Sequence, residues 1–167
     1  MKDGMIPGSS ALSIREMRKT DLDALSRLLM IPSISESLHW RPSSEEIRDD
    51  YARYWSDPDE ANYVIALNGE MIGWIKLNGL AEKDTLWISM LAIHPEHQGK
   101  RVGRMALDWA ERFARGNGYR RVGIQTTADN CPAIALYVKA GYRMETSRKD
   151  AQCYVFTKDV AGPVRQP

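Results

Sequence analysis

The alternation of apolar and polar residues divides the chain into strands and helices in a mixed order. Apolar residues at every second position, or in short unbroken runs, predict strands over residues 12–15, 63–67, 71–77, 85–93, 121–126, 142–146 and 151–157. Helical spacing predicts two helices after the first strand, one after the fourth and one after the fifth. The expected order is therefore β, α, α, β, β, β, α, β, α, β, β, which is an α/β fold.

Residues at helix ends set the limits of the first two helices. Thr20 is placed to cap the first helix and Pro32 to end it. The buried face of that helix is expected to consist of Leu22, Leu25, Leu28 and Leu29. Residues 31–42 then read as a turn-rich connection. Ser43 and Glu46 form a capping-box pair, which opens the second helix.

Turn residues indicate how the strands are connected. Asn68-Gly69 predicts a tight hairpin between the second and third strands. Residues 85–126 form a strand, helix, strand unit, so their two strands should be parallel neighbours with a right-handed crossover. The result is a mixed sheet of about six or seven strands with flanking helices. Strand 85–93 is largely apolar, which predicts burial on both of its faces.

A polar loop between the fourth strand and the long helix is the segment that carries most chemical information. The loop reads Gln98-Gly99-Lys100-Arg101-Val102-Gly103-Arg104. Apolar residues at helical spacing follow it at Val102, Met105, Ala106, Trp109, Ala110 and Phe113. Free backbone N–H groups at a helix start, the helix dipole and nearby cations make an anion site that suits a diphosphate. Arg101 is expected to have ordinary right-handed φ and ψ, with its side chain pointing outward.

Composition restricts the classes of protein to which the chain could belong. Its 167 residues suit one domain over residues 11–160, with tails at 1–10 and 161–167. The net charge of +1 gives no bulk attraction to nucleic acid or to an acidic membrane. No apolar run is long enough to span a bilayer, and two cysteines do not suggest a disulfide framework. The first ten residues lack a signal-peptide core, so a cytoplasmic location is expected.

Asn130 and Tyr137 lie seven residues apart in the last helix, so both are expected on one face. Asn130 can be a plain N-cap, and Tyr137 can be a core aromatic residue with a satisfied hydroxyl. The residues alone favour the structural interpretation for Tyr137. No His, Cys or Asp cluster has the spacing of metal ligands, so no metal is expected.

Two segments resemble the signatures of the GNAT acetyltransferase superfamily. Residues 98–103 are similar to its acetyl-CoA loop, Gln/Arg-x-x-Gly-x-Gly/Ala, except that Arg101 replaces the first motif glycine. Residues 130–142 are similar to its second signature, an Asn, then Ala, then Leu-Tyr-x-Lys-x-Gly-Tyr/Phe. The resemblance covers about residues 12–158. It implies the GNAT fold, with acetyl-CoA as the acetyl donor.

The resemblance also implies roles for particular residues. Tyr137 would be the general acid that protonates the departing CoA thiolate. The backbone at the end of the fourth strand would pair with the pantetheine arm, where a β-bulge commonly opens a V-shaped cleft. The residues that would contact the coenzyme are Leu91, Ala92, Ile93, Gln98, Gly99, Lys100, Arg101, Val102, Gly103, Arg104, Asn130, Ala133 and Tyr137.

The acceptor is much harder to read from the sequence. The residues on or near the central strand that could act as a base are Glu82, Asp84, Ser89, His94 and His97. No spacing singles out one of them. Trp40, Trp74 and Trp87 could line an acceptor pocket or belong to the core. Cys131 reads as a small residue at a helix start, since no histidine partner is visible.

We therefore predict an N-acetyltransferase that moves the acetyl group of acetyl-CoA to a primary amine by direct attack in a ternary complex. The acceptor would be a small molecule or a peptide, and an exposed edge in the last strands could support a homodimer. One alternative is a non-catalytic acyl-CoA-binding regulatory module of the same fold. A second alternative is an interaction domain without a cofactor.

Overall fold

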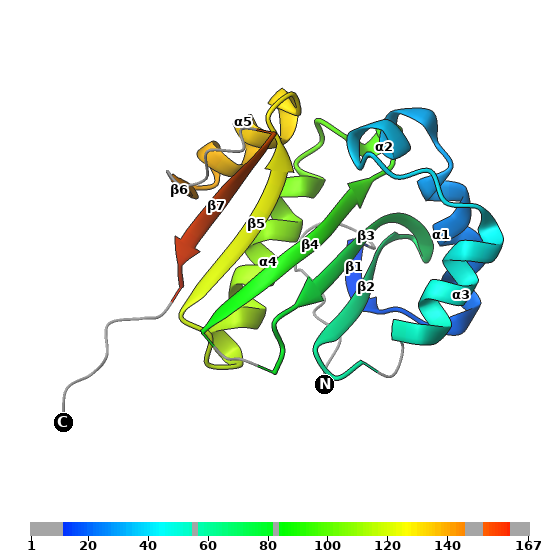
Figure 1. Ribbon diagram of the computed structural model, residues 1–167, viewed down its shortest axis with the longest axis horizontal. Coiled ribbons are helices and arrows are strands. Elements are labelled where there is room, and N and C mark those ends of the chain that lie inside the picture. Colours follow the sequence, from blue (N-terminus) through cyan, green and yellow to red (C-terminus); the bar gives the residue numbers. More distant parts are fainter. Residues whose placement is uncertain (1–11, 55–56, 82–83, 146–151, 161–167) are drawn as a thin grey trace.

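The computed structural model describes residues 12–54, 57–81, 84–145 and 152–160. They form a central sheet with helices on both faces (Figure 1). The predicted tails at 1–10 and 161–167 lie outside the described residues. The helical segments are η1 (Lys19–Asp21), α1 (Leu22–Leu29), α2 (Pro32–Ser37), α3 (Ser44–Tyr54), η2 (Pro95–His97), α4 (Val102–Gly116) and α5 (Cys131–Lys139).

The sheet has seven strands in the order β1-β2-β3-β4-β5-β7-β6. The number of strands agrees with the predicted mixed sheet of about six or seven. The strands are β1 (Leu12–Glu16), β2 (Glu60–Leu67), β3 (Glu70–Asn78), β4 (Thr85–Ile93), β5 (Arg121–Thr127), β6 (Arg143–Glu145) and β7 (Cys153–Asp159). Strands β4 and β5 pair in parallel, which confirms the predicted strand, helix, strand unit. The other pairs are antiparallel.

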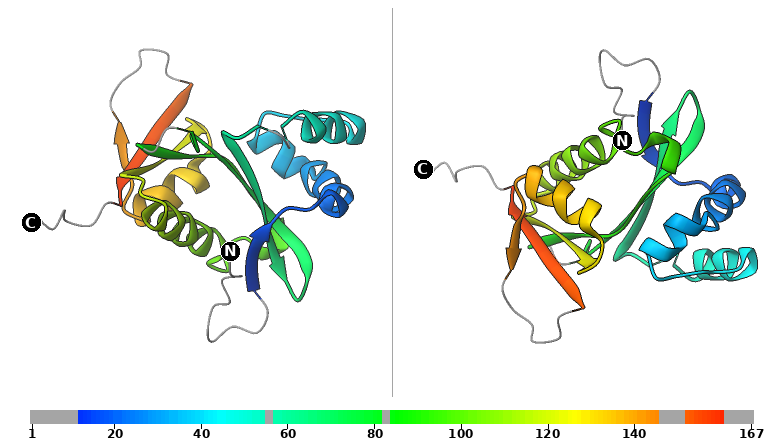
Figure 2. Two further views of the ribbon diagram at one scale, coloured as in Figure 1. Left: turned by 90° about the horizontal axis from the view of Figure 1, so that it is seen from below. Right: turned by 90° about the horizontal axis from the view of Figure 1, so that it is seen from above.

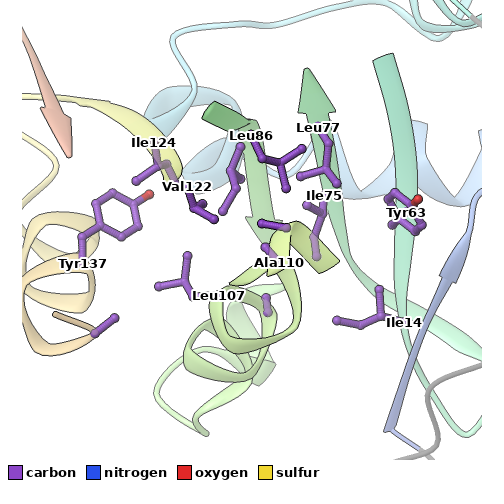
Figure 3. Packing of buried hydrophobic residues seen from close by; sticks show 14 of the residues in the cluster. Ile14, Tyr63, Ile75, Leu77, Leu86, Leu107, Ala110, Val122, Ile124 and Tyr137 are labelled. Carbon is purple, nitrogen blue, oxygen red and sulfur yellow. The ribbon is translucent and has the colours of Figure 1, made fainter. Parts of the chain in front are cut away.

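Helices cover the sheet unequally on its two faces. Figure 2 shows α1, α2 and α3 on one face, and α4 and α5 on the other. The core under α4 combines the small residues Ala106, Ala110 and Ala114 with Leu107, and they pack against branched strand residues such as Leu86 and Val122 (Figure 3). Small side chains let the helix approach the sheet closely, which fixes the position of the loop that precedes it.

The first helical region differs from the sequence prediction. Thr20 does not cap α1, because the short segment η1 comes first and the carboxylate of Asp21 accepts the N–H of Arg18 (2.7 Å). Pro32 does not merely end a helix, since it is a first-turn residue of α2, which the prediction placed in a loop. Proline is favoured there because a first-turn N–H has no intrahelical acceptor. The predicted leucine face is buried as expected, at Leu22, Leu25, Leu28 and Leu29.

The predicted hairpin turn and the predicted capping box of α3 are confirmed. Asn68 and Gly69 both have positive φ, 52° and 86°, as a two-residue hairpin turn of the primed type needs. Ser43 Oγ accepts the N–H of Glu46 (3.1 Å), and the Glu46 carboxylate accepts the N–H of Ser43 (2.6 Å). Gly141 follows α5 with a φ of 87°. These signals depend on hydrogen bonds between near neighbours, so the sequence alone reveals them.

Strand β4 is not buried on both faces, contrary to the sequence prediction. Leu86 and Ile88 are buried under α4, but Trp87 is 36% exposed and Ser89 is exposed. The reason is that none of the described helices covers the other face of β4 at this point (Figure 2). Trp87 lies instead over the bare backbone of Gly123, where an added Cβ would come within 2.5 Å of the indole ring.

Arg101 also differs from the prediction, because its φ is 66° and its ψ is 4°. This is the left-handed region, which an L side chain occupies at a cost of about 1–2 kcal/mol. Gly99, two residues earlier, has a φ of 70°. The chain therefore turns twice with positive φ before α4 begins, and a glycine in the place of Arg101 would relieve strain.

A charged pair joins α4 to the last described strand. Lys158 Nζ lies 2.7 Å from Glu111 Oε2 and donates to the carbonyl of Ala140 (2.9 Å). The Glu111 side chain is 9% exposed and that of Lys158 is 25% exposed. The pair therefore connects α4, β7 and the end of α5 in a mostly dry environment.

We predict that Glu111→Ala lowers the free energy of unfolding by about 2–3 kcal/mol, since it leaves a mostly buried ammonium without its anion. Urea unfolding followed by circular dichroism measures the change. Glu111→Leu combined with Lys158→Met should recover most of the loss. A double variant as unstable as the single one would show that the pair is not the cause.

We predict that Arg101→Gly and Arg101→Val change stability in opposite directions. Glycine should raise the free energy of unfolding by about 0.5–1 kcal/mol, because it removes the left-handed strain at some cost in chain entropy. Valine should lower it by about 1 kcal/mol or more, because a β-branched residue is disfavoured at positive φ. Thermal unfolding of both variants measures the two changes in stability. Equal shifts of the melting temperature with the same sign would contradict backbone strain at Arg101.

Candidate functional site

The pairing of β4 with β5 stops half-way along both strands. Their parallel register runs from Thr85 with Arg121 to Ile88 with Ile124 and goes no further. Beyond this point β5 stays paired only with β7, up to Thr127. The β5-facing backbone edge of residues 89–93 is therefore left open, and a cleft begins where the two strands diverge.

A β-bulge in β4 marks the start of the divergence. Lys76 of β3 pairs with Met90, and the next residue, Leu77, pairs with Ile88, so Ser89 is the additional residue. Ser89 Oγ donates to the carbonyl of Lys76 (3.2 Å). A bulge bends a strand and increases its twist, which accounts for the separation from β5. The bulge that the family resemblance implied is therefore present.

The larger cavity of the cleft, about 640 Å³, is called here the β4–α5 cavity. Its walls come from the end of β4, the loop before α4, α5 and the missed helix α2. The residues that line it are Ser33, Ile34, Ser37, Leu38, Leu91, Ala92, Ile93, Gln98, Gly99, Arg101, Gly103, Arg104, Asn130, Pro132, Ala133, Ala135, Leu136, Tyr137 and Lys139.

A second cavity of about 520 Å³ lies between the diverging strands and is called the β4–β5 cavity. It includes Trp87, Ser89, Met90, Gln125 and Thr127. The two cavities adjoin, because both are lined by Ser37, Leu38, Leu91, Asn130, Ala133 and Tyr137. A ligand that extends along the first cavity would therefore end where the second one opens.

The structure places most of the predicted coenzyme residues on the β4–α5 cavity, but not all of them. Lys100 and Val102 do not line it. Val102 is 6% exposed and belongs to the core under α4, whereas Lys100 is exposed to solvent. Side chains of the loop thus alternate between the cavity, the core and solvent, which its sequence did not reveal.

Hydrogen bonds position the backbone of the loop at residues 98–104 along the cavity wall. Gln98 Nε2 donates to the carbonyl of Ile93 (2.9 Å), which ties the loop to the end of β4. Near the start of α4, the N–H of Met105 donates to the carbonyl of Arg101 (3.0 Å). The N–H groups of the first-turn residues before Met105 therefore have no intrahelical acceptor. These amides and the positive end of the α4 dipole favour an anion at this end of the cavity.

Cationic side chains surround the same end of the cavity. Arg101, Arg104 and Lys139 are among its lining residues. Arg104 is held in place, because its guanidinium donates to Asp108 (2.9 Å) and to the carbonyl of Lys139 (3.1 Å). The latter bond joins the start of α4 to the end of α5. The positive charge is therefore local, although the whole chain is almost neutral.

Asn130 has the structural role that its position predicted and also lines both cavities. Its side-chain oxygen accepts the N–H of Ala133 (3.3 Å), which caps α5. Gly103 lies across from α5, where an added Cβ would come within 2.9 Å of Leu136 Cδ2 and 3.3 Å of Ile93 Cδ1. The absence of a side chain at Gly103 thus lets α4, β4 and α5 approach one another beside the cavity.

Tyr137 lies at the junction of the two cavities and is 5% exposed. Its ring packs edge-on against Phe156, with centroids 5.5 Å apart. Figure 3 shows its hydroxyl directed toward the strand that carries Ile124. Burial raises the pKa of Tyr137 to about 12, so the phenol stays protonated at neutral pH and can donate a hydrogen bond into the cleft.

The residues that were considered as bases do not converge on the cleft. Asp84 is paired with Arg121 (3.1 Å), and His94 Nδ1 accepts the N–H of Glu96 (3.3 Å). His97 lies beside His94, with ring centroids 6.0 Å apart. Ser89 lines the β4–β5 cavity, and Glu82 lies outside the described residues. Cys131 is exposed at the start of α5 and lines neither cavity.

Sequence reasoning missed the wall that α2 supplies to the cleft. Ser33, Ile34, Ser37 and Leu38 line the β4–α5 cavity, although they were assigned to a loop. A proline at the first helical turn, followed by Ile34 and Leu38 four residues apart, was the available signal.

Within the described part of the chain, no group of His, Cys, Asp or Glu could hold a metal ion. None of the helices described is both long and apolar enough to cross a bilayer.

Comparisons with known proteins place this chain in a family. The profile of the acetyltransferase (GNAT) family matches residues 24–142, which is more than half of the chain. Streptothricin acetyltransferase of Escherichia coli is 29% identical over 89 residues, which cover 53% of this chain and 51% of that relative. The chain thus spans about half the length of the curated relatives it matches first.

Solved structures agree with the family match. An acetyltransferase from Thermus thermophilus is 25% identical, with a TM-score of 0.77 and coverage of 89% of this chain and 97% of that one. Spermidine N-acetyltransferase from Vibrio cholerae, solved in complex with CoA and spermine, shares the fold at 19% identity, with a TM-score of 0.77 and coverage of 89% and 95%. Both the sequence profile and the fold therefore show that the chain belongs to the GNAT family of acetyltransferases.

Proposed function

We propose that this protein transfers the acetyl group of acetyl-CoA to a primary amine, with both substrates bound at once. The observation that carries the proposal is the position of Tyr137 at the junction of two adjoining cavities. One cavity has a cationic helix start at its far end and suits the coenzyme. The other opens between the diverging strands and gives an amine access to the thioester.

The charge and polarity of the residues around the β4–α5 cavity support the assignment of the coenzyme to it. The first-turn amides of α4, with Arg101 and Arg104 beside them, suit the diphosphate. The open backbone edge at Leu91–Ile93 suits the amide groups of the pantetheine arm, since it faces the gap left by β5. Ala133 and Leu136 form an apolar wall along α5 for the rest of the arm.

The chemistry follows from the groups that meet at Tyr137. Acetyl-CoA supplies an activated thioester carbonyl, whose carbon forms a bond to the amine nitrogen while its bond to sulfur breaks. Backbone N–H groups near Leu91–Ile93 would polarise the carbonyl oxygen. The phenol of Tyr137 would donate its hydrogen bond, and then its proton, to the sulfur that departs with the electron pair. The proton lost by the amine passes to solvent.

The raised pKa of Tyr137 makes its hydrogen bond more important than its acidity. A thiol has a pKa of about 8.5, so a phenol with a pKa of about 12 gives up its proton to a thiolate only with an opposing free energy of roughly 5 kcal/mol. A hydrogen bond that strengthens as negative charge develops on sulfur offsets part of this cost. Tyr137 therefore stabilises the leaving group first and protonates it afterwards.

A non-catalytic acyl-CoA-binding module of the same fold is the competing function. The strained Arg101 in the place of a family glycine favours it, and so does the lack of a carboxylate or histidine lining the two cavities of the cleft in the described residues. A CoA-release assay over a panel of primary amines separates the two functions. CoA binding without turnover of any amine would support the module.

We predict that Gly103→Leu raises the dissociation constant for CoA at least about tenfold, because the new side chain must displace Leu136 and Ile93 at the cavity wall. Lys100→Ala should raise it less than about threefold, since an exposed charge contributes little. Isothermal titration with CoA measures both. Gly116→Leu, an exposed glycine substitution at the other end of α4, is the matched control. Equal losses at Gly103 and Lys100 would contradict the proposed site.

We predict that Tyr137→Phe lowers kcat at least about a hundredfold while CoA affinity changes less than about twofold, because only the departing sulfur needs the hydroxyl. In the wild type, ionisation of Tyr137 should cause no loss of rate between pH 8 and pH 10, because its pKa is about 12. Tyr142→Phe is the control, since Tyr142 lines neither cavity. A Tyr137→Phe variant with full kcat would contradict the role.

A further inference from the structure

A third cavity lies on the other side of the sheet from α4, between α1, α3 and strands β2–β4. It has a volume of about 320 Å³ and is called here the α3 cavity. It combines aromatic rings with carboxylates, which neither cavity of the cleft does. The residues that line it are Leu25, Trp40, Ile47, Asp50, Tyr51, Glu60, Asn62, Trp74, Lys76 and Met90.

The polar groups of the α3 cavity leave it with a net negative charge. Glu60 is 10% exposed, its Oε2 lies 2.8 Å from Lys76 Nζ, and its Oε1 accepts from Asn78 (2.7 Å). One carboxylate is thus balanced by the ammonium of Lys76. Asp50 is half-buried and has no ion pair or hydrogen bond within the described residues. The charge of Asp50 is therefore available to a ligand.

Three aromatic residues share the α3 cavity with the two carboxylates. Trp40, Tyr51 and Trp74 all line the α3 cavity. The indole N–H of Trp74 donates to Asn62 Oδ1 (3.0 Å), which fixes the orientation of that ring. Aromatic faces attract an ammonium group through their quadrupole, and a carboxylate adds a charged hydrogen bond. The same surroundings repel an anion, so the cavity suits an alkylammonium group.

Met90 connects the α3 cavity to the proposed reaction centre. It lines both the α3 cavity and the β4–β5 cavity, and it follows the bulge residue Ser89. The strand register places Asn62, Lys76 and Met90 side by side across the sheet. A flexible aliphatic ligand that passes through the β4–β5 cavity can therefore run from Tyr137 past Met90 to Asp50, because this cavity opens between the diverging strands.

We propose that the acceptor is an aliphatic diamine or polyamine and that the α3 cavity binds its second, non-reacting ammonium group. The proposal rests on the acetyltransferase function and specifies its substrate class. The attacking amine lies in the β4–β5 cavity beside Met90. The second ammonium lies among Trp40, Tyr51 and Trp74, where Asp50 accepts its hydrogen bonds. The methylene chain between the two amines packs on Met90.

The test compares two acceptors that differ only at the far end, 1,5-diaminopentane and pentylamine. CoA release by the full chain gives kcat and KM for each. The diamine should have a kcat/KM at least about tenfold higher, because a hydrogen bond to a charged group is worth roughly that factor or more. Equal kcat/KM values for the two amines would overturn the proposal.

Asp50→Asn should raise the KM for diaminopentane at least about tenfold, with kcat changed less than about threefold. The same variant should leave the KM for pentylamine unchanged, since that amine has no second charge. Asp49→Asn is the matched control, because Asp49 is an exposed neighbour on α3 that does not line the cavity. An equal effect of Asp50→Asn on both amines, or no effect on either, would overturn the proposal.

A binding measurement separates this proposal from the acetyltransferase function itself. Diaminopentane should raise the melting temperature of the CoA complex in the wild type but not in Asp50→Asn, since a ligand that binds the native state stabilises it. If CoA binds and the enzyme acetylates monoamines and diamines with the same kcat/KM, only the diamine site is overturned. Failure of CoA to bind the wild type would overturn the acetyltransferase function, and the diamine proposal with it.

Discussion

The end of hydrogen bonding between β4 and β5, at Ile88 and Ile124, is the constraint on which the rest of the site depends. A continuous parallel pair would leave no space between the strands and no unpaired backbone edge. The bulge at Ser89 bends β4 away, while β5 stays with β7, which pairs along its whole length. The sheet thus loses several hydrogen bonds at its centre, and a ligand with amide groups can replace them.

The open cleft keeps its shape because α4 is packed closely on the sheet. Ala106, Ala110 and Ala114 are fully buried against it, and Gly103 leaves room for Leu136 of α5. Such packing fixes where α4 begins, so the preceding loop must turn sharply to reach it. The positive φ of Arg101 is a result of that requirement. Local strain at this residue is tolerated because the surrounding core determines the path of the chain.

The two faces of the sheet have opposite chemical character near the point of divergence. Arg101 and Lys139 make the far end of the β4–α5 cavity positive, whereas Asp50 gives the α3 cavity a net negative charge, because Lys76 balances Glu60. The net charge of +1 conceals this separation. The proposed anionic coenzyme and cationic amine would therefore enter from different sides of the sheet and meet at Tyr137.

Features that depend on near neighbours in the chain were determined by the sequence itself. The Asn68-Gly69 hairpin, the Ser43–Glu46 capping box and the Asn130 cap each follow from a few adjacent residues. The order of strands and helices, apart from the missed helix α2, follows from hydrophobic periodicity. Only the tertiary structure decided the sign of φ at Arg101, the exposure of Trp87 and the placement of Asp50 and Trp74 around one cavity. The physical reason is that these features depend on packing between segments far apart in the chain, which no local pattern encodes.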